Sequence, residues 1–131
     1  MNVMTEELMI SAEALKEYLH QGQTLFLLEL RHPEDLYHEE HEWSLFKVRG
    51  GLLLQSDTVE RHLTEIPPDQ AIVIISDGPG DVISIEASRQ LQKHGWKNIR
   101  VLEGGFKAYL EESLPVEPIK NVLPATKVMN L

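Results

Sequence analysis

Ser76 is the residue whose position most invites chemistry. It ends the branched apolar run AIVIIS (71–76), a turn of glycine, proline and aspartate follows, and a helical pattern begins at Val82. Backbone N–H groups converge at such strand–turn–helix junctions, where α/β proteins bind ligands. A serine hydroxyl becomes a nucleophile only beside a base, and His32, which follows a neighbouring predicted strand, is the sensible candidate. The chain lacks a G-x-S-x-G motif, so a Ser76 that ends the strand and hydrogen-bonds to the turn is favoured.

Two further patterns resemble ligand sites and have simpler explanations. Gly78-Pro79-Gly80 precedes a helix, but it is neither G-x-G-x-x-G nor a phosphate-binding P-loop, and it contains no lysine. A tight turn that needs glycine explains it. His38 and His41 are three residues apart and would share a helix face, as metal ligands do. No third ligand is identified, so a solvated acidic helix is favoured, and no metal or cofactor is expected.

Composition narrows the class of protein. The chain has 131 residues, enough for one domain, and a formal net charge of −9. This charge argues against nucleic acid or an anionic membrane as a partner. The chain has no cysteine, which excludes disulfides, thiolate metal sites and a thiol nucleophile. No apolar run approaches the length of a membrane-spanning helix, and Glu6 and Glu7 replace the basic residues of a secretory signal. We therefore expect a cytoplasmic protein.

Predicted strands alternate with predicted helices along the chain. Strands are predicted at 24–30, after the two glycines of VRGGLLLQS (48–56), at 71–76 and at 99–103, and helices at 11–19, 33–41, 57–66, 82–94 and 104–113. The run 71–76 is continuous and β-branched, which is typical of a strand buried on both faces of a parallel sheet. This alternation predicts an α/β fold with a mostly parallel sheet and helices on both faces.

Four segments, in this order and spacing, resemble a rhodanese-homology domain. They are LLELRHPEDL (27–36), VRGGLLLQ (48–55), AIVIIS (71–76) and GWKNIRVLEGGFKAYLEESLPV (95–116). The resemblance implies a rhodanese-like α/β fold with a central sheet of about five strands. It divides the chain into an N-terminal extension (1–9), the domain (10–116) and a C-terminal tail (117–131), which we expect to lie on the surface or to be partly disordered.

The resemblance also shows where this chain departs from the family. Ser76 stands at the position of the family's catalytic cysteine. The loop that follows has Asp77 and Asp81 and no basic residue, although the family usually has an arginine there, and the segment up to Gly95 is about two residues longer than usual. Glu29 replaces the family's aspartate beside a retained Arg31, to which the resemblance assigns a structural role. The two residues alternate at the end of a predicted strand, so their side chains are expected to share one side of the sheet. A sulfurtransferase needs a thiolate to carry sulfur, and a hydroxyl cannot form a persulfide.

The sequence therefore predicts a single-domain rhodanese-like protein that lacks the catalytic cysteine and acts as a binding or regulatory module. Three alternatives stay open: a hydrolase or phosphate-handling enzyme using Ser76, an active sulfurtransferase whose cysteine was replaced by serine, and a scaffold acting through the acidic helix or the tail. A protein partner is expected, and a basic one suits the acidic loop. The oligomeric state is open. The candidate site comprises the loop Ser76, Asp77, Gly78, Pro79, Gly80, Asp81 and Val82, supported by Glu29, Arg31 and His32.

Overall fold

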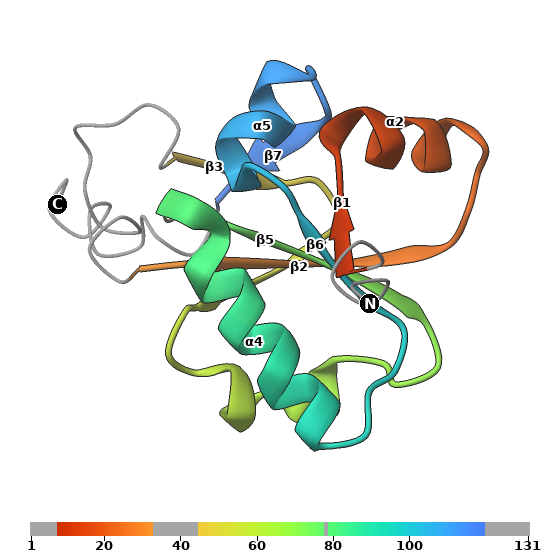
Figure 1. Cartoon of the computed structure of the whole chain (residues 1–131). Coiled ribbons are helices and arrows are strands. Elements are labelled where there is room, and N and C mark those ends of the chain that lie inside the picture. The colour runs from red at the N-terminus through yellow and green to blue at the C-terminus, as the bar shows by residue number, and fades with distance from the viewer. Residues whose placement is uncertain (1–7, 33–44, 78, 120–131) are drawn as a thin grey trace, which may run out of the picture.

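The computed structural model describes residues 8–32, 45–77 and 79–119. Its centre is a sheet of five parallel strands in the order β1-β6-β5-β2-β4 (Figure 1). Their bounds are β1 Met9–Ile10, β2 Leu25–Arg31, β4 Leu52–Gln55, β5 Ala71–Ser76 and β6 Ile99–Leu102. The predicted α/β class and parallel sheet are confirmed. In the part of the chain that the structure describes, no helix is long and apolar enough to span a bilayer.

The central strand β5 owes its position to its sequence. Residues 72–76 are all buried, as expected for branched side chains covered on both faces of a parallel sheet. In register, Ile74 lies opposite Leu28 of β2 and Val101 of β6. The five strands of this sheet run parallel, so their carboxyl ends lie at the same edge. Ser76, the last residue of β5, lies at that edge beside Leu30 of β2.

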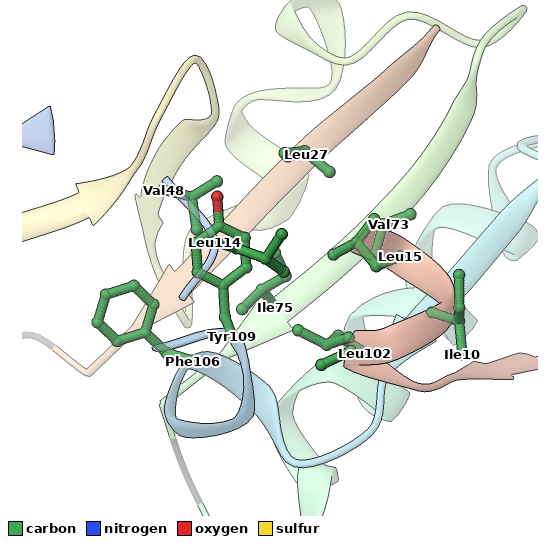
Figure 2. Close-up of a cluster of buried hydrophobic side chains, with 11 residues drawn as sticks. Ile10, Leu15, Leu27, Val48, Val73, Ile75, Leu102, Phe106, Tyr109 and Leu114 are labelled. Atoms are coloured by element: carbon green, nitrogen blue, oxygen red, sulfur yellow. The ribbon is translucent and has the colours of Figure 1, made fainter. Parts of the chain in front are cut away.

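Helices cover both faces of the sheet, as predicted. Figure 1 shows α2 (Ala12–His20) and α5 (Gly105–Glu111) on one side and α4 (Val82–Lys93) on the other. Leu15 of α2 and Tyr109 of α5 pack with Val73 and Ile75 in one core cluster (Figure 2). Leu91 of α4 belongs to a second core cluster, which contains strand side chains from the opposite face of the sheet, such as Ile72 and Ile74. Ser11 caps α2, its Oγ accepting a hydrogen bond from the Ala14 N–H at 3.0 Å.

One predicted element differs from the structure. The helix expected at 57–66 is two short 3₁₀ turns, Val59–Arg61 and Leu63–Glu65, because His62 interrupts the helical backbone and no side chain caps either turn. The strand expected after Gly50 and Gly51 is confirmed as β4, and the turn before it places Gly50 at a φ of +73°. The helix predicted at 33–41, with His38 and His41, lies outside the described residues.

A second, two-stranded sheet joins distant parts of the chain. β3 (Phe46–Val48) pairs antiparallel with β7 (Val116–Pro118). The Lys47 ammonium adds an ion pair with Glu117 at 2.8 Å. The first residues of the predicted tail thus form part of the fold, and Ile119 is buried. Residues 120–131 lie outside the described part, and the domain boundaries stay a prediction.

Candidate functional site

Ser76 is enclosed at the carboxyl end of β5. The residue has no exposed surface. Its Oγ has no hydrogen-bond partner among the described residues, so the expected hydrogen bond to the turn is not observed there. The next residue continues the sheet contact, because the Asp77 N–H donates to the Leu30 carbonyl at 3.3 Å. The hydroxyl therefore has neither solvent access nor an observed base.

Asp77 joins the loop to the end of β2. Its Oδ2 accepts a hydrogen bond from the His32 backbone N–H at 3.3 Å, and its Oδ1 lies 3.5 Å from His32 Nδ1. The Asp77 side chain is only 2% exposed, whereas that of His32 is about half exposed. His32 was the predicted base for Ser76, and the structure places it against the neighbouring carboxylate instead.

Asp81 fixes the other end of the loop. It precedes α4 in a left-handed backbone conformation, with a φ of +59°, and it is largely buried. Its Oδ2 accepts a hydrogen bond from the Gly104 N–H at 3.1 Å. Asparagine and aspartate tolerate this conformation better than most residues. The hydrogen bond from Gly104 holds the Asp81 carboxylate in place, so this carboxylate is fixed at the start of α4.

The two glycines at the start of α5, Gly104 and Gly105, are required by the backbone conformation and by a close contact with Ser76. The φ of Gly105 is +61°, and a Cβ built there would lie 2.2 Å from the Ser76 carbonyl oxygen. Gly104 also has a positive φ, +84°. The turn therefore packs directly on the backbone of Ser76, and only glycine fits that approach.

Glu29 and Arg31 form a buried ion pair behind the loop. Arg31 Nε donates to Glu29 Oε2 at 2.8 Å, and Glu29 Oε1 accepts the Val48 N–H at 2.8 Å. Arg31 also donates to the Phe46 carbonyl and stacks over the Phe106 ring, 4.3 Å from its centroid. Burial raises the pKa of Glu29, and the Arg31 charge opposes that rise. The prediction that the two side chains share one side of the sheet is confirmed, and their contacts match the structural role expected for Arg31.

A cavity of about 340 Å³ opens beside the loop. Among the described residues, Asp77, Phe106, Lys107 and Leu110 line it. Leu110 is 38% exposed, and Val82, which opens α4, is 67% exposed. A solvent-facing apolar side chain such as Leu110 beside a hollow is typical of a binding surface. We call the four lining residues, Asp77, Phe106, Lys107 and Leu110, the mouth.

The structure brings most of the predicted site together. Ser76, Asp77, Asp81 and the start of α4 lie around one turn. Glu29 and Arg31 pair with each other at the end of β2, and His32, which follows β2, contacts Asp77. Gly78 lies outside the described residues. Sequence reasoning missed Lys107 and Leu110 of α5, although the glycine pair before that helix signals a close approach to another segment. The described residues contain no cluster of three or more metal-ligating side chains.

Known proteins give the same architecture. The family model of the rhodanese-like domain matches residues 11–112. A rhodanese-like domain protein from Staphylococcus aureus is 20% identical, with a TM-score of 0.68 over 86% of this chain and 98% of that one. The rhodanese-like domain of an Anabaena protein is 22% identical, with a TM-score of 0.68 over 86% and 80% of the two chains. No curated protein sequence matches the chain.

Proposed function

The chain belongs to the rhodanese-like domain family, and we propose that its loop at residues 76–82 binds a partner. We propose further that this loop does not carry sulfur. The observation that carries the proposal is the state of Ser76, which is enclosed and is followed in the same loop by the carboxylates of Asp77 and Asp81. In the sulfurtransferase reaction, a cysteine thiolate attacks the outer sulfur of thiosulfate, sulfite leaves with the bonding electrons, and a persulfide remains. A serine hydroxyl cannot hold that sulfur.

The two carboxylates of the loop oppose the same reaction, although Lys107 also lines the adjoining cavity. Thiosulfate and the persulfide product are anions, and a basic residue would have to stabilise them. Here Asp77 accepts from His32, and Asp81 accepts from Gly104, so both carboxylates are held in place by hydrogen bonds. Each close carboxylate–anion contact costs on the order of 1 kcal/mol or more near a protein surface. The loop therefore disfavours the substrate as well as lacking the nucleophile.

The mouth has the properties of a surface that recognises a protein segment. Its cavity of about 340 Å³ is large enough for one or two side chains, and Leu110 offers an apolar contact within it. The exposed Val82, at the end of the adjoining loop, offers a second apolar contact outside the cavity. The chain carries a net charge of −9, which attracts a basic partner and repels an acidic one. The occupant is a peptide segment with an apolar anchor residue and flanking lysine or arginine.

Selection of peptides from a random library tests this proposal. We expect enrichment of peptides that combine an apolar anchor with basic residues, and their affinity should fall with added salt. Val82→Lys and Leu110→Lys should each weaken binding by about 10-fold or more, because they remove an apolar contact and add repulsion. Gln92→Lys is the matched control, since it adds the same charge on an exposed position of α4, and it should leave binding nearly unchanged. Peptides that bind all three variants like the parent protein would contradict the proposal.

A further inference from the structure

A second cavity, of about 280 Å³, lies at the amino-terminal ends of the parallel strands. Its lining includes Leu25 and Ala71, the first residues of β2 and β5, and Asn98 and Arg100 at the start of β6. Ser76 is the last residue of β5, so the mouth and this cavity are at opposite ends of the sheet. We propose that the second cavity binds a small organic oxyanion, a carboxylate or phosphate attached to an apolar body.

Arg100 provides the charge for this site. Successive side chains of a strand point to opposite faces, so Arg100 lies on the same face of β6 as Leu102. That face packs against α2 and α5, and Leu102 is completely buried in the core there (Figure 2). Arg100 is thus a half-buried cation at the margin of an apolar face. Within the described ranges it forms no ion pair, although the chain as a whole carries a net charge of −9.

The other lining residues fit the two parts of such a ligand. The Asn98 and Gln23 side-chain amides supply N–H donors. Gln23 Nε2 donates to Gln21 Oε1 at 3.2 Å, which leaves its second N–H for another acceptor. Tyr18 and Leu25 are half-buried and give an apolar wall. A guanidinium pairs with carboxylate or phosphate through two parallel hydrogen bonds, and the amides extend that set.

A purely structural explanation for Arg100 makes a different prediction. β1 pairs with Val101 and Leu102 only, so the part of β6 that holds Arg100 has no neighbour on that side within the described chain. An inward-pointing charge protects such an edge from pairing with another chain. Edge protection requires no ligand, whereas the proposed site requires saturable binding that depends on the anionic group.

Amide NMR titrations of the full chain separate the two explanations. The probes are benzoate and phenyl phosphate, which share an apolar ring and differ in the oxyanion, with benzamide and inorganic phosphate as the matched neutral and ring-free compounds. We expect benzoate, phenyl phosphate or both to shift the amides of Gln23, Ala71, Asn98 and Arg100 saturably. Saturation should occur at millimolar concentrations, on the order expected for so small a ligand. Which probe binds more tightly distinguishes a carboxylate from a phosphate.

Two variants complete the experiment. Arg100→Gln keeps a polar side chain but removes the guanidinium and its charge, and it should weaken binding by about 10-fold or more. Arg89→Gln removes an arginine whose side chain is 73% exposed on α4 and should change nothing. The proposal is overturned if neither anion gives a saturable shift, if Arg100→Gln binds equally well, or if benzamide matches benzoate. It is also overturned if inorganic phosphate binds as tightly as phenyl phosphate, because the apolar wall then contributes nothing.

Discussion

Arg31 Nε donates a hydrogen bond to Glu29 Oε2 at 2.8 Å, and neither side chain has any exposed surface. The pair connects three elements, since Glu29 also accepts from Val48 of β3 and Arg31 stacks on Phe106 of α5. The strand end that precedes His32 is therefore fixed from two sides. The loop is joined to this strand end through the contacts between His32 and Asp77.

Breaking this pair should cost much of the stability of the domain. We expect Arg31→Leu to lower the free energy of unfolding by about 3–5 kcal/mol, because it leaves the Glu29 carboxylate buried without its cation. Urea unfolding followed by circular dichroism measures the change. The double variant Glu29→Leu/Arg31→Leu should lose less than the sum of the single changes, since no isolated charge remains. A loss below about 1 kcal/mol in Arg31→Leu would contradict the role given to the pair.

Gly105 should tolerate no side chain. In Gly105→Ala, a Cβ would lie 2.2 Å from the Ser76 carbonyl oxygen, and the backbone would keep a positive φ. We expect a loss of about 3 kcal/mol or more in unfolding free energy. Gly22→Ala is the control: its φ is also positive, +75°, but nothing lies within 4 Å of the new Cβ. That variant should lose only about 1 kcal/mol. Equal losses would show that the turn does not press on Ser76.

Tyr109 should make the fold sensitive to alkaline pH. Its hydroxyl donates to the Pro115 carbonyl at 2.5 Å, and burial, together with the charge of Glu29, raises its pKa above the ordinary 10.0. Above pH 10 the unfolded chain ionises this phenol while the folded chain keeps it neutral. The stability that Tyr109 contributes is therefore complete below pH 10 and is lost as pH rises beyond it.

Tyr109→Phe isolates this effect. Near neutral pH we expect the variant to be less stable by about 1 kcal/mol, because the Pro115 carbonyl loses its donor. The difference should shrink by about 1 kcal/mol between pH 10 and 11, since only the parent protein loses stability through this group. Urea unfolding at the two pH values measures it. A difference that stays constant would mean that Tyr109 has the same pKa in both states.

The elements around Ser76 could be predicted from sequence because their signals are local. The β-branched run 71–76, the glycine- and proline-rich turn and the helical pattern from Val82 each report on their own segment. The side shared by Glu29 and Arg31 followed from strand alternation alone. The family resemblance then assigned the order of the segments.

These local sequence patterns could not predict contacts between distant parts of the chain. β3 and β7 have three residues each and meet across about 70 positions of the chain, so neither shows a periodicity of its own. The contact of His32 with Asp77 depends on how two strand ends align. Arg100 belongs to no motif in the sequence, and its place beside a cavity becomes visible only in the structure.

Mass spectrometry of Ser76→Cys after incubation with thiosulfate tests the central claim most directly. We predict a folded variant whose introduced thiol gains no sulfur atom and that forms no thiocyanate when cyanide is added, because the enclosed position and the carboxylates of Asp77 and Asp81 oppose the anion. Stoichiometric gain of one sulfur atom, with catalytic thiocyanate formation, would contradict it. That result would mean that the loop is a working sulfurtransferase site in which a single atom has been replaced.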